Sequence, residues 1–344
     1  MSREITIKAF LDLSSEIPVV DVRAPSEFMH AHIPGAINVP LFSDEERAVV
    51  GTIYKKKGQK EAILEGMDIA GKKIKSLAET GIKKSKNGKL LVHCWRGGMR
   101  SEAMSWFFEK TGLECYVLKG GYKSYRNFIS DYFSGRFKFC ILGGMTGSGK
   151  TSVLHELEKR GQQVIDLEKI AHHKGSVFGL LGEAAQPSNE QFENEIFHSL
   201  YSMNKAEIIW IEDESRNIGR NIIPGDIFKR MSKSPLVILE VPRGLRIEML
   251  VKEYGKFPDE DLTVCLNIIS RRLGGLNTKL SIDALLEGKP EKTADILLTY
   301  YDKTYLYNNV RSKRKKINVI TSIIDPVENA NLILEAIELN GIYK

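Results

Sequence analysis

The sequence predicts an α/β protein of two domains, each built on a parallel sheet. Its 344 residues exceed what one hydrophobic core usually serves, since a domain commonly has about 150 residues. Short apolar runs alternate with helical stretches along the chain, which is typical of parallel sheets covered by helices. Two glycine-rich motifs lie well apart, at residues 93–101 and 144–151, and this favours one functional site in each domain.

In the first domain, apolar runs bounded by turn residues predict the strands. These runs are residues 17–22, 36–40, 89–94 and 115–118. The polar and aromatic stretch that follows ends near Arg136, and we expect the domain boundary there. The predicted domains are residues 1–135 and 136–344.

The second domain begins with a new series of apolar runs. They cover residues 137–142, 163–166, 207–211, 236–241 and 317–320. Because such runs are apolar on both faces, they predict a central parallel sheet with a doubly wound topology, as in nucleotide kinases. The pattern over residues 253–303 predicts a helical insert, and a closing helix is expected over residues 326–339.

The composition predicts an ordinary globular protein of the cytoplasm. No apolar run is long enough to span a bilayer, and the first residues lack the pattern of a secretory leader. The net charge of +6, from 50 basic and 44 acidic residues, does not by itself indicate a nucleic-acid partner. The clustering of basic residues is more suggestive, although each cluster could also be a solvated surface. The candidates for phosphate-backbone contact are Lys55, Lys56, Lys57, Arg311, Lys313 and Arg314.

The first motif indicates a reactive cysteine. Cys94 ends an apolar run, and a glycine-containing loop separates it from a helix that should begin near Arg100. Backbone amides at a helix N-terminus and the nearby arginines favour the thiolate form of Cys94. The alternative is an inert buried cysteine, which is our expectation for the other three cysteines. Four scattered cysteines fit neither a disulfide framework nor a metal site of the C-x-x-C type.

The first domain resembles the rhodanese family over residues 1–135. The resemblance rests on residues 21–28 (DVRAPSEF), 32–40 (HIPGAINVP) and 118–121 (LKGG). It implies that Cys94 carries transferable sulfur or selenium, and that Asp21 and Arg23 brace the loop.

Five residues separate Cys94 from Arg100, a spacing also found in cysteine phosphatases, whose loop surrounds a phosphate. A phosphatase is therefore a competing interpretation, although the sequence indicates no loop aspartate that would protonate a leaving group. The predicted anion-binding loop consists of Trp95, Arg96, Gly97, Gly98, Met99 and Arg100.

The second motif, residues 144–151, satisfies the P-loop pattern G-x-x-x-x-G-K-[ST] between an apolar run and a helix. Its backbone amides should hold phosphate oxygens, Lys150 should reach a terminal phosphate, and the Thr151 hydroxyl would bind Mg²⁺ if this ion is present. The acidic run after a strand, Glu212, Asp213 and Glu214, contains the second candidate metal ligand; the sequence leaves open which of the three would face the metal, and we favour Asp213. We expect residues 172–179 to form a functional loop nearby. The predicted diphosphate-binding residues are Gly144, Thr146, Gly147, Ser148, Gly149, Lys150 and Thr151.

The two domains together resemble the tRNA 2-selenouridine synthase family over nearly the whole chain. Further segments carry this resemblance: residues 51–55, 171–179, 186–188 and 212–219. It implies a transferase that converts wobble 2-thiouridine of tRNA to 2-selenouridine through an S-geranylated intermediate. Geranyl diphosphate and selenophosphate would be substrates, and no tightly bound organic cofactor is implied.

On this interpretation the P-loop holds the prenyl diphosphate and the Cys94 loop receives selenophosphate. Arg96 and Arg100 would pair with its oxygens, Cys94 would accept selenium, and the basic clusters would contact tRNA. Three alternatives stay open. They are a sulfurtransferase coupled to an ATP-dependent kinase or adenylating domain, a cysteine phosphatase-like domain fused to a P-loop NTPase, and an RNA-binding module with vestigial loops.

Overall fold

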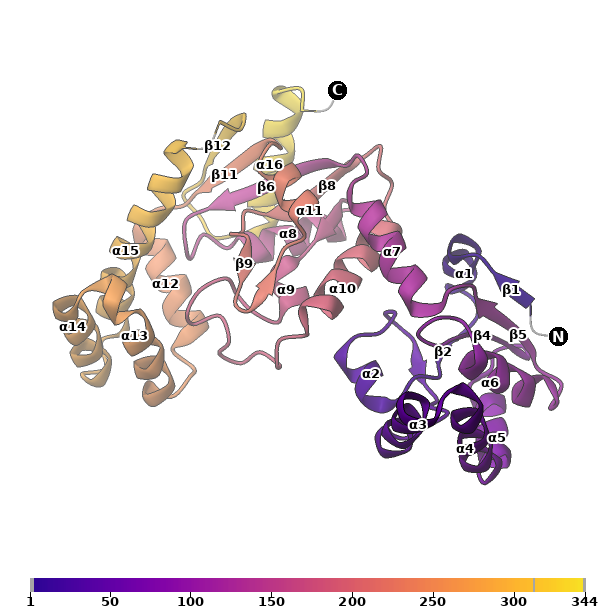
Figure 1. The fold of residues 1–344 in the computed structure, drawn as a ribbon. Helices are drawn as coiled ribbons and strands as arrows, with labels where there is room; N and C mark the ends of the chain where they lie inside the picture. The colour runs from indigo at the N-terminus through magenta and orange to yellow at the C-terminus, as the bar shows by residue number, and fades with distance from the viewer. Residues whose placement is uncertain (1–2, 312, 343–344) are drawn as a thin grey trace. The chain divides into compact units, whose positions relative to one another are not determined.

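The computed structural model describes residues 3–311 and 313–342, in two compact units (Figure 1). The first unit is Met1–Phe133 and the second is Ser134–Lys344. The division therefore lies close to the boundary expected after residue 135. Within the described ranges, none of the helices is both long enough and apolar enough to cross a membrane.

The first unit contains a five-stranded parallel sheet with strand order β1-β5-β4-β2-β3. Its strands are β1 (Arg3–Ile5), β2 (Val19–Asp21), β3 (Ile37–Asn38), β4 (Lys89–His93) and β5 (Glu114–Leu118). The four expected strands are confirmed. The short edge strand β1 was not expected, because its three residues are too few to show the alternation of apolar and polar side chains that predicts a strand.

Seven helices accompany this sheet: α1 (Ile7–Leu13), α2 (Pro25–His30), α3 (Asp44–Lys57), α4 (Gln59–Gly71), α5 (Ile74–Lys84), α6 (Met99–Glu109) and α7 (Gly121–Phe133). Helices α3–α5 form one insertion between β3 and β4. Ser43 begins α3 with a reciprocal capping box to Glu46. The core between this insertion, the sheet and α6 includes Leu90, Met104 and Phe108, all fully buried.

The second unit contains a five-stranded parallel sheet with strand order β12-β11-β6-β8-β7. The strands are β6 (Lys138–Gly144), β7 (Gln163–Ile165), β8 (Ile208–Glu212), β11 (Leu236–Glu240) and β12 (Lys316–Ile320). All five expected strands are confirmed. A short hairpin, β9 (Asn217–Ile218) and β10 (Asn221–Ile222), lies outside this sheet.

The helices of the second unit fall into two groups. Those that belong to the α/β framework are α8 (Lys150–Lys159), α9 (Leu167–Ala171), α10 (Asn189–Tyr201), α11 (Gly225–Met231) and α16 (Pro326–Leu339). A helical subdomain consists of α12 (Arg243–Tyr254), α13 (Asp259–Leu273), α14 (Gly275–Leu286) and α15 (Pro290–Arg311), which lie together in Figure 1. Its own core includes Leu266, Leu285 and Leu297. Both the helical insert and the closing helix were expected.

Candidate functional sites

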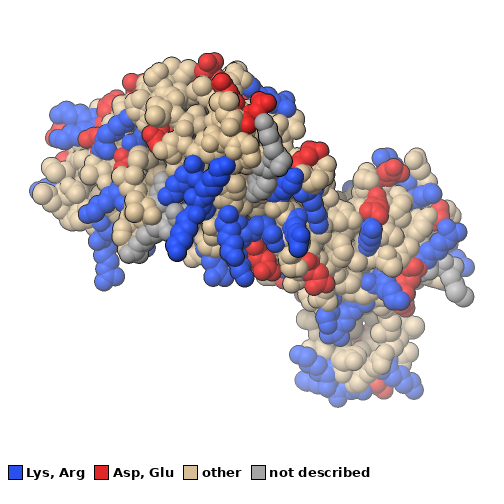
Figure 2. Space-filling view, turned by 90° about the horizontal axis from the view of Figure 1, so that it is seen from above, with Lys and Arg blue, Asp and Glu red and all other residues tan. Residues whose placement is uncertain are grey.

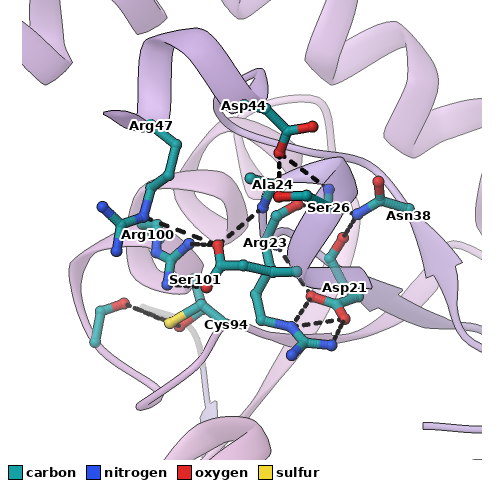
Figure 3. Close-up of polar contacts among 12 residues, drawn as sticks. Asp21, Arg23, Ala24, Ser26, Asn38, Asp44, Arg47, Cys94, Arg100 and Ser101 are labelled. Carbon is teal, nitrogen blue, oxygen red and sulfur yellow. Dashed lines mark hydrogen bonds and ion pairs between the residues drawn. The ribbon is translucent and has the colours of Figure 1, made fainter. Parts of the chain in front are cut away.

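Cys94 lies directly after the central strand β4, and α6 begins at Met99. The side chain is only 4% exposed. Its Sγ atom lies 3.3 Å from the hydroxyl oxygen of Ser101, which in turn donates a 2.9 Å hydrogen bond to the Gly98 carbonyl (Figure 3). The loop thus turns back on itself, and Cys94 is among the residues that line a pocket of about 560 Å³.

Two glycines allow this loop to pack tightly against the start of α7. Gly97 has a φ of +64°, and a Cβ there would lie 2.4 Å from the carbonyl oxygen of Leu118. Gly121 has a φ of +59°, and its Cβ would lie 2.4 Å from the carbonyl oxygen of Cys94. The amide of Tyr122 donates a 2.8 Å hydrogen bond to that same Cys94 oxygen. Only glycine fits these backbone conformations at such close approach.

Arginines surround the mouth of the Cys94 pocket, but they are not equally available. Arg100 donates a 2.7 Å hydrogen bond to Glu27, and Nε of Arg47 lies 3.8 Å from the same carboxylate. Arg96 is exposed at the rim. Three arginines and one glutamate line the pocket, so its net charge is 3 − 1 = +2. The pocket can therefore attract an anion, although Arg100 already has a protein partner.

Glu27 was not singled out by the sequence, because it lies 73 residues before Arg100. Burial alone would raise the pKa of this carboxyl, but the hydrogen bond and charge of Arg100 lower it. Glu27 is therefore ionised at neutral pH and cannot donate a proton. A phosphatase needs a protonated acid beside its leaving group, so this carboxylate does not fill that role.

Asp21 and Arg23 form a buried ion pair beneath the loop, with 2.6 Å between Nη2 of Arg23 and Oδ2 of Asp21 (Figure 3). Burial alone would raise the pKa of Asp21, but the His93 ring and Arg23 lower it. Burial also lowers the pKa of His93, so its ring is uncharged at neutral pH. Arg23 is therefore the cation that balances the Asp21 charge. The Arg23 guanidinium stacks 4.0 Å from the ring centroid of Tyr122. This pair braces the loop, as the resemblance implied.

The P-loop connects β6 to α8 at the centre of the second sheet. Gly147 has a φ of +80°, and a Cβ there would lie 2.8 Å from the carbonyl oxygen of Arg246. Nζ of Lys150 donates a 3.0 Å hydrogen bond across the loop to the Gly144 carbonyl. The buried hydroxyl of Ser148 has no hydrogen-bond partner among the residues that the structure describes, and a phosphate oxygen could supply one.

Next to the P-loop lies a pair of carboxyl groups, Glu214 of the acidic run and Glu168, which the sequence did not identify. The Thr151 hydroxyl donates a 3.2 Å hydrogen bond to Glu168, which hydrogen bonds to Glu214. Burial raises the pKa of Glu168, and burial together with Glu168 raises the pKa of Glu214 to about 8. Both side chains are partly exposed, and both lie within range of the Lys150 charge. Strongly perturbed carboxyl groups beside an anion loop are typical of functional sites.

The two candidate metal ligands each have a protein partner. Thr151 contacts Glu168, whereas Asp213 accepts hydrogen bonds of 2.7 and 3.2 Å from Arg314. Within residues 3–311 and 313–342, no group of three or more His, Cys, Asp or Glu side chains could hold a metal ion. Mg²⁺ at the P-loop stays a prediction.

An apolar cavity of about 330 Å³ opens beside Thr146 of the P-loop. Its walls come from α12–α15 and from the segment 172–179, which contributes Ser176 and Phe178. Arg246 joins the P-loop to the helical subdomain, because it donates to the Thr146 carbonyl and pairs with Asp302 at 2.8 Å. Most of the remaining lining residues are aliphatic or aromatic: Leu250, Val251, Tyr254, Leu262, Leu266, Leu285, Leu297 and Tyr301.

The segment 172–179 lies next to the P-loop, as expected. Gly175, with a φ of +67°, faces both Glu168 and Glu214, since a Cβ there would lie within 3.0 Å of each. His173 is buried and accepts a hydrogen bond from the Gly175 amide, whereas His172 bonds to the Ala185 carbonyl. These histidines shape the loop.

The candidate tRNA contacts differ in exposure. Lys55, Lys56 and Lys57 are exposed in the last turn of α3, and Lys313 is exposed as well. The side chain of Arg314 is only 12% exposed and is paired with Asp213, so its charge is already neutralised. The Arg311 side chain lies outside the described part of the structure. Figure 2 shows Lys and Arg side chains gathered in patches on the face that it displays.

The other three cysteines are buried and unpaired with one another, as expected. Burial raises the pKa of Cys115 and of Cys140 to about 12. These thiols therefore stay protonated at neutral pH and behave as small core side chains.

Comparisons with known proteins match both units. Residues 137–329 match the family model of the tRNA 2-selenouridine synthase AAA domain, and residues 6–128 match the rhodanese-like domain. The chain is 35% identical to the tRNA 2-selenouridine synthase of Aeromonas salmonicida, over 90% of this chain and 91% of that protein. It is 35% identical to that of a Sulfurovum species, over 86% and 89%. The protein of the same name from Marinobacter nauticus is 33% identical, over 85% and 88%.

Proposed function

Because this chain belongs to the tRNA 2-selenouridine synthase family, whose members are enzymes of tRNA modification, we propose that it exchanges sulfur for selenium in two steps, one at each loop. The P-loop unit would geranylate the sulfur of 2-thiouridine, and the Cys94 unit would replace the geranylated sulfur by selenium. The observation that carries this division is the apolar cavity of about 330 Å³ beside the P-loop.

The first step joins a prenyl chain to the thiocarbonyl sulfur. The bond between C1 of geranyl diphosphate and its oxygen breaks, a bond from C1 to sulfur forms, and diphosphate leaves. Lys150 and the loop amides stabilise this leaving anion. The base loses its N3 proton as the sulfur is alkylated. We assign the acceptor of this proton to the Glu168–Glu214 pair, which lies beside Lys150 and Thr151.

The cavity favours a prenyl donor over a nucleotide. Thr146 lines the cavity, so a chain attached to a diphosphate in the loop can extend directly among the leucine side chains of α12–α15. A ribose in the same place would lose water contacts against walls that are mostly aliphatic or aromatic, although Ser176, Asp259 and Thr293 are also among the lining residues. This supports geranyl diphosphate over the ATP of a kinase or adenylating domain.

The second step begins when the Cys94 thiolate attacks C2 of the geranylated base and displaces geranylthiol, which takes a proton from water. The selenium of selenophosphate then displaces Cys94 from C2. Water finally attacks phosphorus, so phosphate leaves, the C2 selenocarbonyl forms and N3 regains a proton. Selenium keeps the oxidation state that it has in selenophosphate, so the sequence of steps needs neither oxidant nor reductant.

The charge of the Cys94 pocket suits selenophosphate. Its net +2 arises from Arg47, Arg96 and Arg100 against Glu27. Arg96 is exposed and can pair with the anion, while Glu27 holds Arg100 in place at 2.7 Å. Selenium accepted by Cys94 as a perselenide would require an oxidation, so we place Cys94 as the nucleophile at C2.

Two variants separate the steps. Cys94→Ser should geranylate a thiouridine-containing tRNA at the wild-type rate but form no selenouridine. Lys150→Ala should lose geranylation, by about 100-fold or more, yet convert S-geranyl-2-thiouridine tRNA to the selenouridine form. Mass spectrometry of the nucleosides reports both steps. With selenophosphate omitted, the wild-type protein should release one equivalent of geranylthiol and form a covalent adduct with tRNA at Cys94.

Equal loss of both steps in both variants would contradict this division of labour. Turnover of ATP in place of geranyl diphosphate would favour a kinase or adenylating enzyme. Binding of tRNA with no change in nucleoside mass would favour an RNA-binding module.

A further inference from the structure

The first unit contains a large apolar groove that neither step, as described above, uses. It lies among α3, α4 and α6 and has a volume of about 810 Å³, within the range of pockets that bind small organic ligands. Bulky apolar side chains are exposed along it: Tyr54 at 57%, Met67 at 65% and Trp106 at 54%. Large apolar patches exposed to water commonly mark binding sites, so we expect this groove to bind an apolar ligand.

The groove is continuous with the Cys94 pocket. Arg47, Met99 and Arg100 line both. Met99 is the first residue of α6 and is itself 53% exposed. A ligand whose reacting carbon lies at the Cys94 sulfur can therefore extend past Met99 into the groove without leaving the protein surface.

We propose that this groove binds the geranyl chain of the S-geranylated tRNA intermediate and receives geranylthiol as it leaves C2. This inference rests on the two-step function proposed above. Apolar side chains form its interior, while charged residues such as Lys55 and Glu102 are exposed around it, so a prenyl chain fits it and an RNA backbone does not. The chain would be bound in the second unit while it is transferred and in the first unit while it is displaced.

Occupation of the groove also has a chemical consequence. A chain held along the groove fixes the sulfur to which it is attached next to the pocket, and therefore orients C2 toward the Cys94 nucleophile. Binding energy from a remote part of the substrate is then used to position the reacting atoms. The prediction is a preference for a long S-alkyl group in the exchange step, although that group is discarded.

Two substrates and three variants test this. Anticodon stem-loops carrying S-geranyl-2-thiouridine or S-methyl-2-thiouridine are incubated with selenophosphate, and kcat/KM for selenouridine formation is measured. The wild-type protein should prefer the geranyl substrate by about tenfold or more. Met67→Lys and Trp106→Lys should each lower kcat/KM for the geranyl substrate about tenfold and leave that for the methyl substrate unchanged. Leu64→Lys changes an equally exposed residue of α4 outside the groove and should alter neither value.

A wild-type protein that converts both substrates with equal kcat/KM would overturn the groove assignment while leaving the proposed function intact. Equal losses for both substrates in the groove variants would overturn it as well, provided that their thermal unfolding matches that of Leu64→Lys. Conversion of neither substrate by the wild-type protein would instead contradict the exchange reaction itself. As a second measurement, geranylthiol should inhibit selenation of the methyl substrate in the wild-type protein and not in Trp106→Lys.

Discussion

At the scale of single residues, the sequence indicates the groups that we propose to react, and it misses the distant carboxylates that contact their surroundings. Cys94 and Lys150 belong to local motifs whose spacing predicts their chemistry. Glu27 holds Arg100 from 73 residues away, and Glu168 meets Thr151 across 17 residues. A carboxylate in a helix has no local pattern that names its distant partner, so only the folded chain shows these pairs.

Glu214 gives the first prediction at this scale, through its pKa of about 8. The folded protein binds this proton more tightly than the unfolded chain does. Protonation of Glu214 therefore stabilises the folded state at low pH. The free energy of unfolding should therefore fall as the pH rises from the ordinary glutamate value of 4.5 to about 8. The glutamine of Glu214→Gln is neutral at every pH. Between these two pH values, the free energy of unfolding of this variant should therefore fall by roughly 2–4 kcal/mol less than that of the wild-type protein.

Denaturant unfolding at several pH values measures this difference. Glu158→Gln removes an exposed carboxylate from α8 and should follow the wild-type curve. Parallel curves for Glu214→Gln and the wild type would show that the carboxyl is not buried as a protonated group. In geranylation assays, Glu168→Gln should be slower by about 100-fold, because Glu214 holds its own proton at neutral pH and leaves Glu168 as the proton acceptor of the pair.

At the scale of elements, the strands were predictable and the purpose of the insertion was not. Buried parallel strands are continuous apolar runs, and the runs that lead into both motifs are β4 and β6. β1 escaped prediction because its three residues follow no periodicity. From the insertion α3–α5, the sequence indicated only the basic cluster of Lys55, Lys56 and Lys57, yet α3 and α4 also form one wall of the apolar groove. Each of these helices has a charged face and an apolar face. The sequence does not show what the apolar face contacts.

The Cys94 loop gives a prediction at the scale of an element. Gly97→Ala forces a side chain into a φ of +64° and against the Leu118 carbonyl oxygen, 2.4 Å from the new Cβ. Strain of this kind costs about 1–3 kcal/mol, and we expect a loss of stability of at least that size. We also expect selenation to be lost, because the loop that positions the sulfur must shift. Geranylation by the second unit should continue.

Gly98→Ala is the matched control for stability. Gly98 has a φ of −117°, and nothing lies within 4 Å of a Cβ placed there. Its free energy of unfolding should stay within about 1 kcal/mol of the wild-type value. Equal destabilisation by the two substitutions would mean that loss of glycine flexibility, and not close packing against the start of α7, decides the stability of the loop.

At the scale of the whole molecule, the two units repeat one arrangement on different folds. Each has a loop for an anion at the carboxyl end of a central strand, and each has an apolar cavity beside that loop. A substrate that combines a prenyl chain with a charged group suits both. This shared arrangement, with no shared topology, is what the proposed function requires, since the same prenylated intermediate would be made in one unit and consumed in the other.

On the proposed function the tRNA has to reach both units, and exposed cations give the last prediction. Reversal of Lys55, Lys56 and Lys57 to Glu should weaken tRNA binding and make it less dependent on salt, because each lost phosphate contact lowers the slope of log K against log salt concentration by about 0.7–0.9. Titrations at several salt concentrations measure the slope. A triple reversal of the exposed, scattered Lys8, Lys229 and Lys292 changes the net charge equally and should leave the slope close to that of the wild-type protein. If both triple variants flatten the slope alike, overall charge attracts the tRNA and α3 holds no specific contact. A change confined to the first variant would place the tRNA backbone at the end of α3, next to the groove that we assign to its prenyl group.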